Sequence, residues 1–201
     1  MALDYAGTIA RLGEGARAPD PPVRVFPPAR VSLAANGPAF WAASSPSGTL
    51  ARLGARTGRV LSRLDVAQPI ATAVGYGAVW LASSTRAVLQ RVVGKSLMTI
   101  PIGSIPADVA AGEEAVWVVT PEDGKLWRID PERQDVTGAV SVGATPTFVA
   151  TGGGSVWIAS HSAGTITRVD PRTDEVVQTI PLGRPISGLA FAFGRIWVTA
   201  T

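Results

Sequence analysis

An all-β fold, a β-propeller of four-stranded blades, is predicted for this chain of 201 residues from three observations. Tryptophans recur in similar short runs at intervals of 37 to 40 residues. Around each of them lie β-branched and apolar runs of strand length, bounded by Gly, Pro, Asp and Ser. No stretch shows a sustained helical period. A unit of about 40 residues cannot bury both faces of its sheet alone, and a radial arrangement of such units provides neighbours for every face.

Each unit contains four runs, named A to D in chain order. Run A follows a proline, as in PIATAV (69–74), and run B contains the tryptophan, as in AVWLAS (78–83). Run C is typified by TITRVD (165–170) and run D by EVVQTIPLG (175–183). We expect the tryptophans to fill the space between neighbouring blades, with each indole N–H bonded to a backbone or loop acceptor. These blade tryptophans are Trp41, Trp80, Trp117, Trp157 and Trp197.

The turns between the runs have a consistent chemistry. Glycine lies between runs A and B, where a tight hairpin needs a positive φ. Asp-Pro begins the turn between runs C and D at Asp130 and again at Asp170. Aspartate caps its own backbone and proline fixes φ, so both positions predict a turn.

The two ends of the chain carry complementary parts of one unit. YAGTIARL (5–12) matches SAGTITRV (162–169), which is a run C, and residues 23–28 match run D. The last unit, 186–200, has runs A and B only. We therefore expect one domain over residues 1–201, with five blades and the fifth closed by strands 5–12 and 23–28 joining strands 186–200. Closure removes free sheet edges. A fragment of a longer propeller would show the same pattern, and this alternative remains open.

Composition excludes several chemistries. The chain contains no cysteine, which excludes disulfides, thiolate metal sites and a cysteine nucleophile. The first residues lack the basic start and apolar run of a secretory signal, and no apolar stretch is long enough to span a membrane. Localisation cannot be predicted from these features.

The charge is unevenly distributed along the chain. Residues 1–100 contain eleven Lys and Arg against four Asp and Glu, whereas residues 101–201 contain seven against eleven. The densest basic cluster comprises Arg52, Arg56, Arg59 and Arg63. It fits either an anionic partner or a solvated hairpin. No aromatic residue alternates with these arginines, which favours the solvated hairpin and argues against nucleic acid as a partner.

The units resemble the YVTN-type β-propeller repeat. VWVVT (116–120) and IWVTA (196–200) match its signature with Trp in place of Tyr, and RVDPRTDEVVQTIPLGRP (168–185) is the best single match. The resemblance covers residues 5–201 and implies a propeller. Relatives include virginiamycin B lyase-like proteins, lactonase-like enzymes and non-catalytic binding or sensory domains, and many have more than five blades.

Candidate site residues gather where the D–A and B–C loops meet. If run A is the innermost strand, these loops share one end of the ring, where propeller ligands usually bind. The residues expected on this loop face are Tyr5, Arg30, Gln68, Arg86, Asp108, Glu122, Asp123, His161 and Arg184.

Two classes of function follow from these residues. The first is a non-catalytic binding, sensory or interaction module whose unknown ligand or protein partner docks on the loop face, without a cofactor. The second is a metal-assisted lyase or lactonase-like hydrolase that uses His161, Glu122 and Asp108 around a divalent cation. Resemblance to the lyase implies a histidine-and-glutamate cluster, and the chain has one histidine. The binding module is therefore favoured, and part of a longer propeller in a multidomain bacterial protein is the third possibility.

Overall fold

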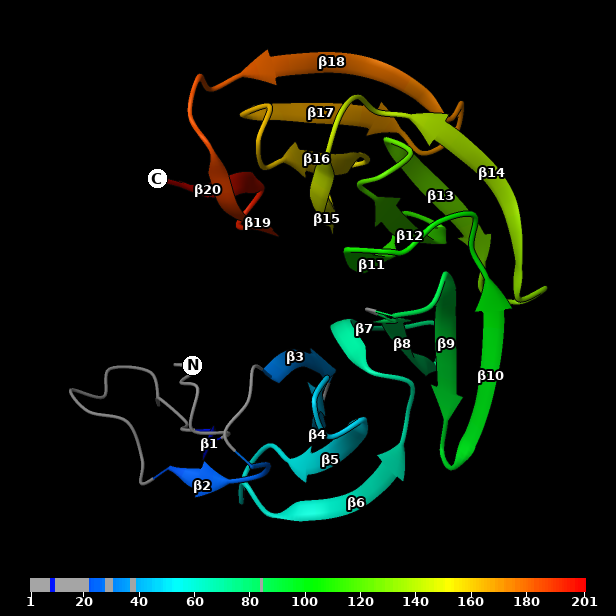
Figure 1. Ribbon diagram of the computed structural model, residues 1–201, viewed down its shortest axis with the longest axis vertical. Helices are drawn as coiled ribbons and strands as arrows, with labels where there is room; N and C mark the ends of the chain where they lie inside the picture. Colours follow the sequence, from blue (N-terminus) through cyan, green and yellow to red (C-terminus); the bar gives the residue numbers. More distant parts are fainter. Residues whose placement is uncertain (1–7, 10–21, 28–30, 37–38, 84) are drawn as a thin grey trace.

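The computed structural model describes residues 8–9, 22–27, 31–36, 39–83 and 85–201, which form strands and turns without a helix. Figure 1 shows four-stranded sheets standing side by side around a common centre, the arrangement of propeller blades. The predicted all-β propeller is confirmed. Among the described residues no helix is present that could cross a membrane.

The four complete blades follow one another in chain order. The first blade is formed by β3 (Val31–Asn36), β4 (Ala39–Ser44), β5 (Thr49–Gly54) and β6 (Val60–Asp65). The second is formed by β7 (Pro69–Gly75), β8 (Ala78–Ser83), β9 (Val88–Val93) and β10 (Ser96–Pro101). The third is formed by β11 (Asp108–Gly112), β12 (Ala115–Thr120), β13 (Lys125–Asp130) and β14 (Asp135–Ser141). The fourth is formed by β15 (Pro146–Thr151), β16 (Val156–Ser160), β17 (Thr165–Asp170) and β18 (Glu175–Pro181).

Two shorter sheets lie at the ends of the described chain. They are β1 (Thr8–Ile9) with β2 (Val23–Arg24), and β19 (Ile186–Ala192) with β20 (Arg195–Ala200).

Strands within a blade pair in chain order and antiparallel, so each blade is a meander from the centre outward. The first strands, β3, β7, β11, β15 and β19, lie nearest the centre and contact one another in sequence. The expected position of run A as the innermost strand is therefore confirmed. Because the strands alternate in direction, the D–A and B–C loops share one end of the arc, and the A–B and C–D turns share the other.

The Asp-Pro turns have the predicted chemistry. Asp130 Oδ1 accepts from the amides of Glu132 at 2.8 Å and Arg133 at 2.9 Å. These bonds lower the pKa of the Asp130 carboxyl, the Arg133 amide having the larger effect. Asp170 Oδ1 accepts likewise from the Arg172 amide at 2.8 Å. Each aspartate side chain thus accepts hydrogen bonds from backbone N–H groups of the turn that have no strand partner.

The hydrophobic core lies between blades. Trp80 and Trp117 are 0 % exposed, and clusters of Val, Ile, Leu and Ala from one blade pack on the inner face of the next. The indole N–H groups of Trp80, Trp117, Trp157 and Trp197 donate to the carbonyls five residues earlier, at 3.0–3.1 Å. The predicted indole bond is thus present at these four tryptophans, whereas full burial between blades is seen for Trp80 and Trp117.

The two halves of the predicted fifth blade are each held by a neighbouring blade. After β2, Val25 and Phe26 are buried against the first blade, and Arg63 Nη2 donates to the Val25 carbonyl at 2.7 Å. At the other end, Ile196 and Val198 of β20 pack against the fourth blade.

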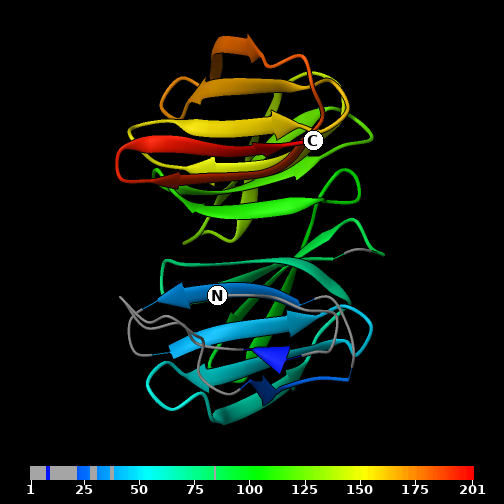
Figure 2. The same cartoon turned by 90° about the vertical axis from the view of Figure 1, so that its left-hand side faces the viewer.

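The two halves are not joined to each other by any of the described residues. β1 pairs with β2 and β19 pairs with β20, and among the described strands no pairing connects the two sheets. Figures 1 and 2 accordingly show an open arc with a terminal half-blade on either side of the gap. Among the described residues β20 has no strand on the side away from β19, and Trp197 is 56 % exposed. Phe193, in the turn between β19 and β20, is 94 % exposed. Much of the segment 5–12 lies outside the described residues, so the closed ring of five blades remains a prediction.

A designed disulfide tests closure. In the fourth blade Ser160 pairs with Thr165, and by the same register Ala200 would pair with Thr8. If the ring closes in solution, a variant with Thr8→Cys and Ala200→Cys forms an intramolecular disulfide, because paired Cα atoms lie within bridging distance. The chain has no other cysteine to interfere. Non-reducing electrophoresis of the monomer measures the bond.

The matched control is Thr8→Cys with Arg195→Cys, which places the second thiol at the other end of β20. Equal cross-linking of both pairs, or cross-linking only between copies, would contradict closure.

Candidate functional site

Asp108, at the start of β11, connects the third and fourth blades. One carboxylate oxygen accepts from the amide of Val109 at 2.9 Å and the other from the amide of Val149 in β15 at 3.0 Å. Burial raises the pKa of this carboxyl to about 6, although both amides act to lower it. Both oxygens are thus engaged by the backbone, and the side chain fixes the spacing of two inner strands.

His161 connects the fourth blade to β19. Its Nδ1 lies 2.6 Å from the carbonyl oxygen of Ile186, so Nδ1 carries the proton that is shared with this acceptor. The Ile186 amide donates back to the His161 carbonyl at 3.2 Å. The imidazole is exposed in the B–C loop, with Nε2 as its second nitrogen.

Glu122 and Asp123 have separate partners. Glu122 Oε2 accepts from the Ser104 hydroxyl at 3.3 Å, across the boundary between the second and third blades. Asp123 accepts from the hydroxyl of Thr120. The same hydroxyl accepts from the indole of Trp127 at 2.8 Å. The two adjacent carboxylates therefore do not act as a pair.

The other predicted site residues are dispersed. Arg86 and Arg184 are exposed in a B–C loop and a D–A loop. Gln68 has a left-handed backbone with φ of 29°. Its backbone N–H donates to the Val66 carbonyl at 3.1 Å. Tyr5 and Arg30 lie outside the described residues.

Asp108, Glu122 and His161 consequently lie at three different blade boundaries. Within the described part of the chain, no group of three or more His, Cys, Asp or Glu residues is placed to hold a metal ion. The arrangement suits positioning of loops more than it suits convergent acid–base chemistry, which needs titratable groups within reach of one substrate atom.

Sequence reasoning missed a ladder of tryptophan–arginine pairs. In each complete blade an arginine of the third strand lies over the tryptophan paired with it on the second strand, with Cζ 5.5–5.8 Å from the ring centre. Such cation–π contacts favour the charged side chain beside the ring face. The signal was present as a constant spacing of eleven residues between Trp and Arg. The pairs are Trp41–Arg52, Trp80–Arg91, Trp117–Arg128 and Trp157–Arg168.

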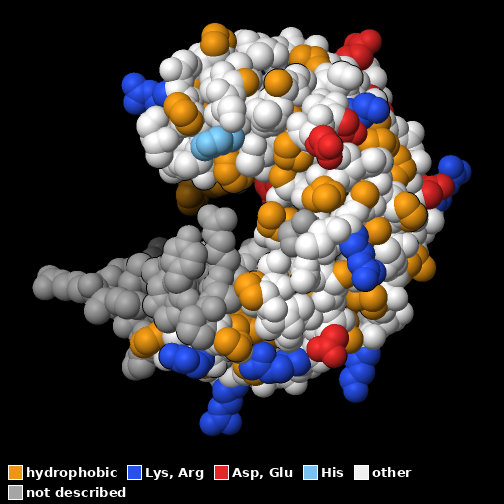
Figure 3. Space-filling model, in the orientation of Figure 1, with side chains coloured by type: hydrophobic (Ala, Val, Ile, Leu, Met, Phe, Trp, Pro, Cys, Tyr) orange, Lys and Arg blue, Asp and Glu red, His pale blue; other side chains and the backbone are white. Residues whose placement is uncertain are grey.

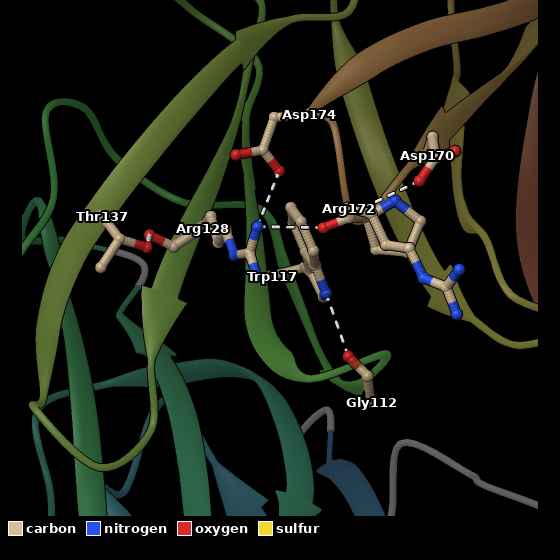
Figure 4. Close-up of polar contacts among 8 residues, drawn as sticks. Gly112, Trp117, Arg128, Thr137, Asp170, Arg172 and Asp174 are labelled. Carbon is tan, nitrogen blue, oxygen red and sulfur yellow. Dashed lines mark hydrogen bonds and ion pairs between the residues drawn. The ribbon is translucent and has the colours of Figure 1, made fainter.

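In the third blade this arginine has an acidic partner. Arg128 Nη1 donates to the Pro171 carbonyl at 2.9 Å and to Asp174 Oδ1 at 3.2 Å, both in the C–D turn of the fourth blade. Figure 4 shows the Arg128 guanidinium beside the Trp117 ring and joined to Asp174 by a dashed line. A cleft of about 210 Å³ remains beside Arg128 and Asp174, lined by other polar side chains. This turn therefore supplies an anion to the arginine of the preceding blade.

We expect the Arg128–Asp174 ion pair to contribute modestly to stability. Both side chains are about one quarter to one third exposed, which screens the interaction. A double-mutant cycle with Arg128→Gln and Asp174→Asn, followed by urea unfolding, is expected to give a coupling free energy of about 0.5–1 kcal/mol. A coupling of zero would mean that the pair is fully screened by water.

A larger groove of about 460 Å³ lies between the first and second blades. Its lining includes Trp41 and Arg52 of the first blade and Lys95 of the second, among apolar side chains. The groove is near the A–B and C–D turns, at the end of the arc opposite to the loop face.

Known structures place the fold among β-propellers. A streptogramin B lyase structure matches with a TM-score of 0.83 at 16 % identity, over 97 % of this chain and 70 % of that chain. Hydrazine synthase of Kuenenia stuttgartiensis matches with a TM-score of 0.70 at 16 % identity, over 79 % and 50 %. Apo AztD from Citrobacter koseri matches with a TM-score of 0.63 at 15 % identity, over 79 % and 48 %.

These likenesses concern the fold alone, because the identities are low. The chain spans about half the length of the hydrazine synthase and AztD chains. No protein-family model matches the sequence, and no curated protein matches it either. The class that fold and site define is thus a β-propeller.

Proposed function

We propose that this propeller is a non-catalytic binding module, and that its ligand or protein partner docks on the loop face. The observation that carries the proposal is the dispersal of the titratable side chains. Asp108, Glu122 and His161 each serve a different blade boundary, and the Asp108 carboxylate is already bonded by two amides. Such a face offers exposed polar loops on a rigid scaffold, which suits recognition.

The repeats support assignment to the YVTN type, and one propeller domain over residues 1–201 is part of the same proposal. A longer native protein with further blades is compatible with it. The streptogramin B lyase likeness leaves a metal-assisted lyase as the competing function, since that neighbour is named as an enzyme.

Metal binding separates the two functions. Isothermal titration with Mg²⁺, Mn²⁺ and Zn²⁺ is expected to show no stoichiometric site that depends on His161. The matched variants are His161→Ala on the loop face and Glu132→Ala in the C–D turn of the third blade. A one-to-one site that His161→Ala abolishes and Glu132→Ala preserves would contradict the proposal and favour the lyase.

A ligand screen tests docking directly. Compounds that raise the melting temperature are expected to lose that effect in Arg86→Glu or Glu122→Lys and to keep it in Glu132→Ala. Both loop-face residues are exposed, so these substitutions leave the core intact. Stabilisation that is unaffected by every loop-face variant would place the ligand elsewhere.

A further inference from the structure

The groove between the first and second blades differs from the other blade boundaries in the turn that faces its arginine. In the fourth blade the C–D turn has four residues, 171–174, and brings the Asp174 carboxylate onto Arg128. In the third blade the position equivalent to Asp174 is Gln134. The backbone N–H of each donates to the carbonyl of the aspartate that precedes its turn, Asp170 or Asp130. In the second blade Val93 pairs directly with Ser96, so the turn has only Gly94 and Lys95.

The two-residue turn of the second blade has no counterpart of Asp174, and it leaves a groove beside Arg52. The groove of about 460 Å³ is within the range of volumes found for small-molecule sites. Among the arginines that lie over a blade tryptophan, Arg52 is exposed whereas Arg91, Arg128 and Arg168 are half-buried. Trp41 is half-buried, in contrast to the fully buried Trp80 and Trp117. The tryptophan–arginine pair that is covered in the second and third blades is therefore accessible here.

The charge of the groove has one sign. Arg52 and Lys95 are its ionisable lining residues, and no carboxylate among the described residues forms an ion pair with Arg52. The surrounding two blades, residues 31–101, contain seven cationic residues and one acidic residue, Asp65. Figure 3 shows Lys and Arg side chains around the first two blades and most Asp and Glu on the later ones. This field attracts an anion to the groove.

Apart from Ser62 and two glycines, the remaining lining is apolar. Leu50 and Leu64 of the first blade face Val74, Val79 and Val92 of the second. A purely inorganic anion would leave this surface unfilled, whereas an apolar body beside the anion would bury it.

We propose that this groove binds a small organic carboxylate with a flat apolar body. Its carboxylate takes the place on Arg52 that Asp174 takes on Arg128, and Lys95 provides a second cation. Its body packs against the aliphatic lining and the accessible edge of Trp41. The site lies at the opposite end of the arc from the loop face. A test of this site therefore gives a result that does not depend on the function proposed above.

Titration with 2-naphthoate tests the site on the intact chain. Saturable binding is expected, with the indole N–H signal of Trp41 shifting in ¹⁵N-correlated NMR spectra and the exposed Trp197 signal unchanged. Trp41→Phe assigns the signal. The neutral analogue 2-naphthamide is expected to bind about tenfold more weakly or worse, because it cannot form charge-assisted hydrogen bonds. Equal binding of the amide, or no saturable binding at millimolar naphthoate, overturns the proposal.

Three charge variants locate the anion contact. Arg52→Gln is expected to weaken naphthoate binding by about tenfold or more. Lys95→Asp supplies an internal carboxylate and is expected to abolish binding. The matched control is Arg59→Gln, which removes an exposed arginine of the same blade outside the groove lining. Loss of affinity in Arg59→Gln equal to that in Arg52→Gln would indicate general attraction by the basic blade and overturn the site.

Discussion

Replacing Trp117 with alanine is expected to lower the free energy of unfolding by about 3–5 kcal/mol. Trp117 is 0 % exposed between the third and fourth blades. Its indole N–H donates to Gly112 at 3.0 Å, and Arg128 lies over its ring. The substitution leaves a large cavity, an unpaired carbonyl and an arginine without its aromatic partner. Urea unfolding followed by circular dichroism measures the loss.

Trp197→Ala is the matched control. Trp197 occupies the same position in its hairpin and makes the same indole bond, at 3.1 Å to Ala192. It is 56 % exposed because, within the described part of the chain, neither a third strand nor a following blade covers it, so its loss is expected to cost about 1 kcal/mol. If Trp117→Ala does not fold, Trp117→Phe against Trp197→Phe gives the same ranking. A loss at Trp197 as large as that at Trp117 would contradict the open arc and indicate that a closing strand covers this residue in solution.

Asp108 is expected to make the stability of the protein depend on pH in an unusual direction. Its pKa is about 6 in the folded chain, against 3.8 for the unaffected group. Between these values the folded state binds more protons than the unfolded state, so the contribution of Asp108 is full below pH 3.8. It is lost as the pH rises through about 6. The difference of about two pKa units corresponds to roughly 3 kcal/mol.

The measurement compares wild type with Asp108→Ala by urea unfolding at several values from pH 4 to pH 8. The difference between the two free energies of unfolding removes most of the effect of other titrating groups. We expect this difference to favour wild type most at pH 4 and to shrink by roughly 3 kcal/mol by pH 7. A difference that grows with pH would mean that the amides of Val109 and Val149 outweigh burial and that the carboxyl is ionised throughout.

The position of Asp108 was foreseen better than its environment. Its place at the start of an innermost strand followed from the repeat. That the Val149 amide of the next blade would reach its carboxylate did not, because this contact depends on how closely two inner strands approach. The loop-face residues follow the same pattern: the sequence indicated the end of the propeller on which they lie, and only the structure assigned each one to a blade boundary.

For the arginine cluster, the sequence did not predict the aromatic neighbour of Arg52. The prediction of a solvated hairpin depended on the absence of aromatic residues between the arginines along the chain. In the sheet, Trp41 pairs with Arg52 from the adjacent strand, eleven residues away. Cross-strand neighbours are set by register, and a search along the chain does not detect them unless a spacing repeats.

What the sequence determined by itself was the local and periodic part of this protein. Strand length, turn chemistry and the recurring tryptophan are encoded within each unit of about 40 residues, because they depend on neighbours a few positions away. The tertiary structure alone decided what happens between units. A two-residue turn in the second blade opens a groove where a four-residue turn in the fourth blade supplies Asp174. The exposure of Trp41, Trp117 and Trp197 follows from which blade lies beside each. These differences arise from packing between distant segments, so identical local patterns acquire different chemistry.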